Sequence, residues 1–251
     1  MGFPFSALQV AHAFAPGSQV SISIPFPGNV TKGDLLIFWG GNGYTSLTDT
    51  QGNIWSPGPD GLCETTNFGA GSLIFIAFAI ASATGPCTVT VSNPATEVWC
   101  CGIAEYGVNP PTLDQNSGNS IGKGFGTVPT PITPILSNTI VIAAAIGTVA
   151  GGQPDVWTVD SGFTVDDTMA SIPFNAGFCL ASLNVAAPGT PINPTFTNAH
   201  WIFGADAVEA NFAGPQIVLP KAFVNTGNLN PMKLPWPEDQ MRHSEGKHYK
   251  R

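Results

Sequence analysis

Glycine and proline interrupt this chain at short intervals, and their spacing constrains the fold more than any other feature. There are 29 glycines and 23 prolines in 251 residues. Glycine weakens a helix and proline breaks its interior, so long helices are disfavoured. Between these residues lie short apolar runs, for example at 34–40, 73–81 and 87–92. Such runs, bounded by Gly, Pro and Asn, are typical of β-strands joined by turns.

The pattern of runs repeats at an offset of about a hundred residues. KGDLLIFWGG at 32–41 matches SNTIVIAAAIG at 137–147, and the strand and turn series after each run has the same order, with Gly85 opposite Gly189. We therefore predict an all-β protein, an antiparallel, jelly-roll-like β-sandwich built from two similar halves at about 30–107 and 137–212. One large sandwich or two small tandem sandwiches would both accommodate two halves. We expect one domain over 1–220.

Charge divides the chain into an acidic body and a basic tail. Residues 1–220 hold 13 acidic and two basic side chains, a net charge of −11, whereas residues 221–251 hold six basic and three acidic side chains, a net charge of +3. An acidic body is not suited to nucleic acid, whose phosphates require clustered Lys and Arg. For 221–251 we predict an extended arm that contacts a neighbouring subunit, and a solvated chain end is the alternative. The residues predicted to act in this arm are Lys221, Lys233, Trp236, Arg242, Lys247, Lys250 and Arg251.

No apolar run is long enough to span a membrane, so we predict no membrane partner. The apolar N-terminal run ends in AHAFA and imitates a secretory signal, but it lacks a positively charged start, so we interpret it as a retained first strand. The five cysteines form no CxxC pair, which indicates buried thiols rather than a disulfide framework or a zinc site. We predict neither a metal nor a cofactor.

The histidines of the sequence form no HExxH motif, and we expect no enzymatic activity. A glycosidase would need two acidic side chains that converge on a cleft, and the spacing of the acids selects no pair among them. The acids considered are Glu64, Glu97, Glu105, Asp166 and Asp167.

The segment TDTQGNIW at 48–55 carries polar residues that suit either a turn or a binding site. Asp49 and Gly52 are also found in calcium loops, but the alternating acids of such a loop are missing, which favours a tight turn between strands. Sandwich lectins bind sugars with exposed aromatic rings and amide side chains. The candidate glycan contacts are therefore Asn53, Trp55, Asn67 and Phe68, with packing of Trp55 at the sandwich edge as the alternative.

Several of these segments together resemble a known family. The order GDLLIFWGG, TDTQGNIW, CTVTVS and IAEYGVNPPTLDQ, within about 30–212, is similar to a β-sandwich module of bacteriophage structural proteins and bacterial surface proteins. The resemblance implies no catalytic residues. It implies a non-enzymatic virion protein, used for capsid decoration or as a tail or fibre appendage, whose partners are copies of itself and other virion proteins. Such a protein would assemble in the host cytoplasm and reside in the virion. The alternative is a carbohydrate-binding module for host attachment on an extracellular surface.

Overall fold

The computed structural model describes residues 3–14, 20–41, 46–56, 63–66, 73–92, 100–117, 119–121, 126–128, 130–149, 156–160, 162–171 and 176–216. These residues form strands, turns and bends, and no helix among them is long and apolar enough to cross a membrane. They belong to one compact unit, Met1–Gln216. The predicted arm at 221–251 lies outside the described residues, as do Asn67 and Phe68.

Sixteen strands are assigned within this described part of the chain. They are β1 (Ala7–Phe14), β2 (Ser21–Pro25), β3 (Leu35–Gly41), β4 (Ser46–Asp49), β5 (Cys63–Thr66), β6 (Leu73–Ile80), β7 (Thr88–Ser92), β8 (Cys100–Tyr106), β9 (Thr112–Asn116), β10 (Asn119–Ile121), β11 (Thr139–Val149), β12 (Trp157–Val159), β13 (Thr164–Ser171), β14 (Ala176–Val185), β15 (Phe196–Asn198) and β16 (Trp201–Ala213).

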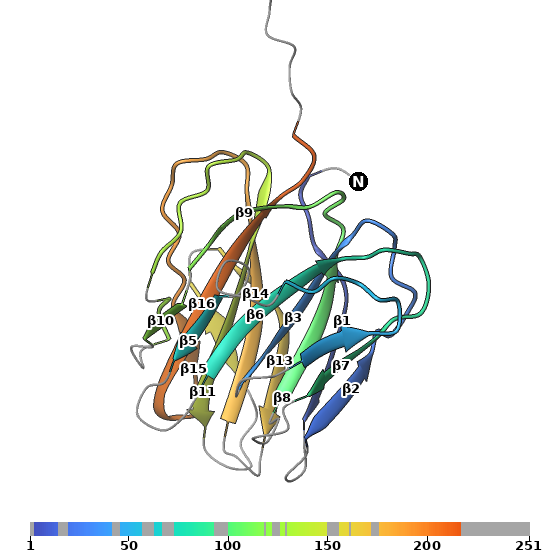
Figure 1. Ribbon diagram of the computed structural model, residues 1–251. Coiled ribbons are helices and arrows are strands. Elements are labelled where there is room, and N and C mark those ends of the chain that lie inside the picture. Colours follow the sequence, from blue (N-terminus) through green and yellow to red (C-terminus); the bar gives the residue numbers. More distant parts are fainter. Residues whose placement is uncertain are drawn as a thin grey trace, which may run out of the picture. The chain divides into compact units, whose positions relative to one another are not determined.

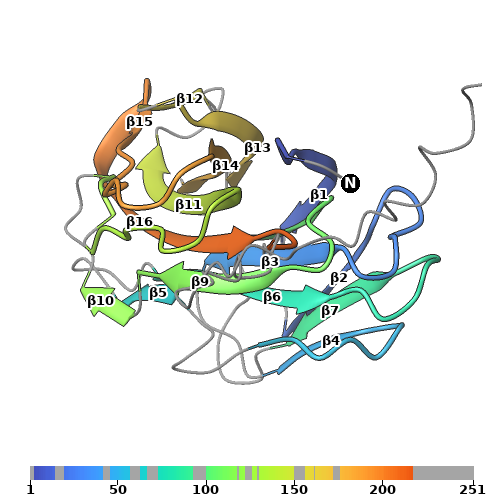
Figure 2. The same ribbon diagram turned by 90° about the horizontal axis from the view of Figure 1, so that it is seen from above.

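The strands form four sheets that are stacked as layers (Figure 1). Two large sheets, with strand orders β1-β8-β3-β6-β5-β10 and β13-β14-β11-β16-β9, lie back to back in the middle, and the small sheets β2-β7-β4 and β12-β15 cover their outer faces (Figure 2). Every pair of neighbouring strands is antiparallel except β5 and β10, which run parallel. The predicted all-β sandwich is confirmed, with this one parallel pair as an exception.

Both halves of the chain pair their strands in the same order. In the first half the large sheet runs β1-β8-β3-β6-β5, and in the second it runs β9-β16-β11-β14-β13. The predicted glycine match also holds, because Gly85 N donates to Val30 O and Gly189 N donates to Pro134 O, each glycine with positive φ. The two similar halves are therefore two sandwiches that share a core. This arrangement is intermediate between one large sandwich and two separate tandem sandwiches, the two possibilities considered from sequence. Jelly-roll-like connectivity stays a prediction.

The largest hydrophobic core lies between the two large sheets and joins the halves. Alternate residues of β3 supply it: Leu35, Ile37 and Trp39 face the other half, whereas Leu36 and Phe38 face the small sheet of their own half. The Trp39 ring lies 6.5 Å from the ring of Phe178 in β14. A strand that packs on both faces must be apolar throughout, which explains the unbroken run LLIFW.

The described cysteines pack as small hydrophobic side chains. Cys87, Cys100, Cys101 and Cys179 are all buried, and the adjacent Cys100 and Cys101 belong to different cores, as strand alternation requires. Burial raises the pKa of the Cys87 thiol to about 12 and also raises the pKa of Cys101. Because the thiolate is the reactive form, these two side chains are held unreactive. The predicted burial of the thiols is confirmed at these four positions.

Candidate functional site

Asp49 holds together the turn at 48–55. Its Oδ1 accepts hydrogen bonds from the backbone N–H groups of Gln51 (2.8 Å) and Asn53 (3.2 Å), and its Oδ2 accepts one from the indole Nε1 of Trp55 (2.7 Å). Gly52 supplies the positive φ of 69° that the turn needs. A carboxylate that organises its own loop in this way is typical of a structural turn, so the turn interpretation is confirmed.

Trp55 and Asn53 are placed inside the protein, which corrects their assignment as glycan contacts. Trp55 is only 5% exposed and packs edge-on against Phe38, and Asn53 is 8% exposed with its Oδ1 bound to the backbone N–H of Ser82. A sugar stacks on the open face of an aromatic ring, and the Trp55 ring has none to offer. The alternative interpretation, in which Trp55 packs at the sandwich edge, agrees with this position.

The role of Asp49 can be measured by comparison with a second turn aspartate. Asp160 follows β12 as Asp49 ends β4, but its carboxylate accepts one hydrogen bond, from the backbone N–H of Thr195 (2.8 Å), whereas that of Asp49 accepts two from the backbone and one from the Trp55 indole. We expect Asp49→Asn to lower the free energy of unfolding by about 1–2 kcal/mol and Asp160→Asn by less than about 1 kcal/mol. Urea denaturation of both variants checks this, and equal losses would contradict an organising role for Asp49.

A second group of polar side chains lies at one edge of the junction between the two halves. Asp166 and Asp167 follow one another in β13, where a β-bulge interrupts the pairing with β14. Neighbouring residues in a regular strand point to opposite faces, but the extra residue of a bulge redirects the side chains that follow it. Both carboxylates therefore meet the first half: Asp166 Oδ2 accepts a hydrogen bond from Tyr106 Oη (2.7 Å), and Asp167 lies 2.9 Å from His12 Nδ1.

Burial and hydrogen bonding change the ionisation of this group in different ways. Burial raises the pKa of Asp166, although the hydrogen bonds from Tyr106 and Ser182 oppose the shift. The pKa of His12 is raised because its ring nitrogen pairs with Asp167. Tyr106 is fully buried, and burial together with the nearby Asp166 raises the pKa of its hydroxyl, so it stays a hydrogen-bond donor.

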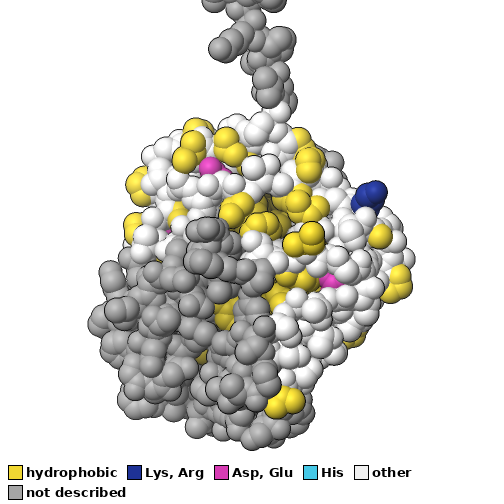
Figure 3. Space-filling view, in the orientation of Figure 1, with side chains coloured by type: hydrophobic (Ala, Val, Ile, Leu, Met, Phe, Trp, Pro, Cys, Tyr) yellow, Lys and Arg dark blue, Asp and Glu magenta, His cyan; other side chains and the backbone are white. Residues whose placement is uncertain are grey.

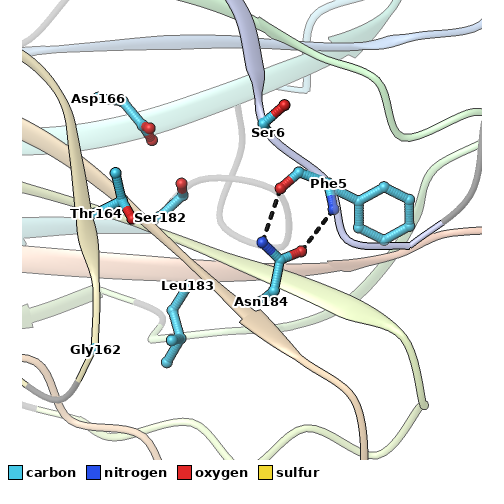
Figure 4. Close-up of a pocket in the computed structure, with 8 residues that line it drawn as sticks. All are labelled: Phe5, Ser6, Gly162, Thr164, Asp166, Ser182, Leu183 and Asn184. Atoms are coloured by element: carbon cyan, nitrogen blue, oxygen red, sulfur yellow. Dashed lines mark hydrogen bonds between the residues drawn. The ribbon is translucent and has the colours of Figure 1, made fainter.

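A pocket of about 270 Å³ opens beside this group (Figure 4). It lies where the start of β1 faces β13 and β14. On one side the backbone of Phe5 is fixed by Asn184, whose Oδ1 accepts from Phe5 N (2.7 Å) and whose Nδ2 donates to Phe5 O (2.8 Å). The lining residues are Phe5, Ser6, Gly162, Thr164, Asp166, Ser182, Leu183 and Asn184.

Glu105, the third described acid among those considered from sequence, has a structural position. It is 2% exposed, its Oε1 accepts a hydrogen bond from Thr31 N (2.7 Å), and its Oε2 accepts one from Gln9 Nε2. Burial raises the pKa of Glu105. Both oxygens hold parts of the first half together, so this carboxylate is not available to a ligand. The side chains of Glu64 and Glu97 lie outside the described part of the chain.

The described residues bring together only some of the candidates from the sequence. Asp166 and Asp167 come together with three residues that the sequence did not single out, His12, Tyr106 and Ser182. Consecutive acids inside a strand pattern were the one available signal. Among the described side chains, no three His, Cys, Asp or Glu residues are grouped so as to hold a metal ion. No family model, curated protein or solved structure matches this chain.

Proposed function

We propose that this protein is a non-enzymatic structural component of a bacteriophage virion, a capsid decoration or a tail or fibre appendage that works by packing against its neighbours. The observation that carries the proposal is the scarcity of charge on the described surface. Of the described Asp, Glu, Lys and Arg side chains, only Lys32 and Asp160 are exposed, and Asp34, Glu105 and Glu209 are buried. On the face drawn in Figure 3, few charged side chains are visible among the described residues.

Such a surface suits close packing between protein subunits. The cores of protein interfaces are depleted in Lys, Glu and Asp, because charged side chains must lose their water when a partner covers them. Large apolar side chains are also exposed, among them Ile54 (89%), Ile135 (65%) and Phe14 (48%). Covering this apolar area would release free energy, and only a small part of that gain would be lost to the desolvation of charged side chains.

The basic segment at 221–251 is the second element of the proposal. Its charge of +3 is opposite to that of the body, at −11 over 1–220. Opposite charges speed the encounter of two surfaces and fix their register. We propose that this segment contacts the acidic body of a neighbouring subunit, with Trp236 as its apolar contact. The charged part of such a contact weakens with added salt, whereas apolar packing does not.

Light scattering on the full-length protein and on residues 1–219 tests this function. We expect a defined oligomer for the full-length chain and a smaller species for 1–219, which retains the compact unit Met1–Gln216. A full-length variant with its six basic residues at 221–251 replaced by Gln tests whether the charge of the arm, and not only its length, is needed for the oligomer. Trp236→Ser tests whether the apolar contact of the arm is needed. A full-length protein that stays monomeric at high concentration would argue against self-association, and equal masses for both lengths would remove the role of the arm.

A further inference from the structure

The pocket beside Asp166 is lined by a carboxylate and by hydroxyl groups, which have no part in the proposed structural role. Its only charged lining residue is Asp166, and no Lys, Arg or His is among the described residues that line it. The carboxylate already accepts the hydroxyl of buried Tyr106. Its negative charge therefore faces a small cavity with no cationic side chain in the lining, and an anionic ligand would be repelled.

Three oxygen-bearing side chains of the lining are grouped on one side of the pocket, whereas the Ser6 hydroxyl and the Asn184 amide lie on the other side (Figure 4). The grouped residues are Asp166, Thr164 and Ser182, on the neighbouring strands β13 and β14, and the Phe5–Asn184 pair closes the other side (Figure 4). Thr164 is exposed and Ser182 is 7% exposed, so the group reaches from the surface into the interior. A carboxylate and two hydroxyl oxygens in a concave site offer three acceptors.

We propose that this pocket binds a primary ammonium group. Such a group carries one positive charge and three N–H donors, which match the charge of Asp166 and the three acceptors. The volume of about 270 Å³ is below the range of about 300–1,000 Å³ that is usual for larger ligands, so it suits an alkylammonium chain. The source is either a free small amine or a lysine side chain of another protein segment.

Two other cation types are disfavoured by the same geometry. A quaternary ammonium group has no N–H donors and is normally held by the faces of aromatic rings. Phe5 is the one aromatic residue in the lining, and its ring points away from the group of oxygen atoms (Figure 4). A metal ion would require more ligands than the described residues bring together. The site therefore selects for N–H donors as well as for positive charge.

The surroundings of Asp166 supply hydrogen bonds but no positively charged side chain among the described residues of the pocket lining, which favours a cation as the ligand. Burial raises the pKa of its carboxyl because the charged form has lost water. The neighbouring Asp167 is already paired with His12, whose Nδ1 lies 2.9 Å away, so that histidine is engaged. An ammonium group in the pocket would replace the lost solvation of Asp166.

NMR titration of the full-length protein with n-butylammonium chloride tests the inference. We expect saturable shifts of the backbone amides of Thr164, Asp166 and Ser182. Sodium chloride, tetramethylammonium chloride and 1-butanol at the same concentrations should give no saturable shifts, because each lacks the charge, the N–H donors or both. Absence of saturable shifts with n-butylammonium, or equal shifts with tetramethylammonium, would overturn the proposal.

Two variants and a control assign the binding to the pocket. Asp166→Asn keeps an oxygen for Tyr106 but removes the charge, and it should weaken n-butylammonium binding at least about tenfold. Thr164→Val, at an exposed position, should weaken it about threefold with the fold intact. Thr168→Val is the control, since Thr168 precedes the core residue Met169 and lies on the opposite face of β13. Unchanged affinity in both pocket variants would place the binding elsewhere.

A peptide competition then distinguishes the two sources of the ammonium group. A synthetic peptide of residues 221–251, which contains four lysines, is compared with the same peptide carrying norleucine at those positions. Displacement of n-butylammonium by the lysine peptide alone would identify a protein side chain as the ligand. Binding of n-butylammonium without displacement would identify a free amine. The inference does not depend on the assembly role, since oligomeric mass and amine binding are measured separately.

Discussion

Alanine at Gly102 is expected to lower the free energy of unfolding by about 2–3 kcal/mol, because a methyl group there would meet the indole of Trp39. The two residues are cross-strand partners in β8 and β3. A Cβ at Gly102 would lie against Trp39 Nε1, Cε2 and Cζ2, much closer than atoms pack in proteins. Trp39 is fully buried in the central core, so its ring cannot move aside without displacing the second half.

A double-mutant cycle with Trp39→Phe makes the mechanism specific. Phenylalanine lacks the ring atoms that a Cβ at position 102 would touch. It also removes an indole N–H that is buried without a hydrogen-bond partner. We expect Trp39→Phe to recover at least about 1 kcal/mol of the loss caused by Gly102→Ala, which urea denaturation of the four proteins would measure. Additive effects would mean that the clash is not with the indole.

Gly28→Ala is the matched control for this cycle. Gly28 is exposed, and a Cβ there would meet nothing closer than the Gln9 side chain at 3.4 Å. Its replacement should change the free energy of unfolding by less than about 0.5 kcal/mol. A comparable loss at both glycines would point to a general effect of alanine on the unfolded chain instead of a packing clash.

The sequence predicted the strands and their duplication because both leave local patterns. The apolar run LLIFW indicates a strand with two buried faces, and the similar run at 137–147 indicates the corresponding strand of the second half. The extent of the repeat was underestimated. β1 and β9 occupy the same place in the two halves, next to β8 and β16, but ALQVAHAF and TLDQN share no pattern. Strand order is fixed by long-range packing, which a local pattern does not encode.

In the candidate site, too, the contacts between residues close in sequence were predicted and those between distant residues were not. Asp49 was correctly assigned to a turn, because its partners lie two to six residues away. Trp55 had two interpretations from sequence, a glycan contact and packing at the sandwich edge, because a tryptophan after a turn occurs in both settings. Asp166 and Asp167 acquire their partners across 60 and 155 residues, at Tyr106 and His12. The bulge that turns both carboxylates to one face has no sequence signature here.

The buried Glu209 of the second half has an apolar residue, Ile103, at the equivalent place in the first half. The pairing of β3 with β8 places Phe38 opposite Ile103, and the equivalent pairing of β11 with β16 places Ala143 opposite Glu209. The smaller Ala143 leaves room for the glutamate. Glu209 is fully buried, its Oε1 accepts a hydrogen bond from Ile132 N (3.0 Å), and its Oε2 has no partner. A carboxylate in this position is costly unless it is protonated.

Burial raises the pKa of Glu209 to about 8, compared with 4.5 for an ordinary glutamate. Between these two values the folded protein keeps the proton and the unfolded chain has lost it, so the free energy of unfolding falls as the pH rises through this window. The proton belongs on Oε2, because Oε1 accepts from the backbone. Below pH 4.5 both states are protonated and the penalty disappears.

Glu209→Gln is therefore expected to stabilise the protein at neutral pH. Glutamine keeps the acceptor for Ile132 N and never ionises, so the variant should exceed the wild type by about 3 kcal/mol at pH 7 and match it at pH 4. Urea denaturation at several pH values measures the difference. Glu105→Gln is the comparison. Burial raises the pKa of Glu105 as well, but both of its oxygens accept hydrogen bonds and a glutamine amide keeps only one acceptor, so its gain should be clearly smaller. A pH-independent difference between Glu209→Gln and the wild type would show that Glu209 is ionised in the folded protein, with a counter-ion that replaces the lost water.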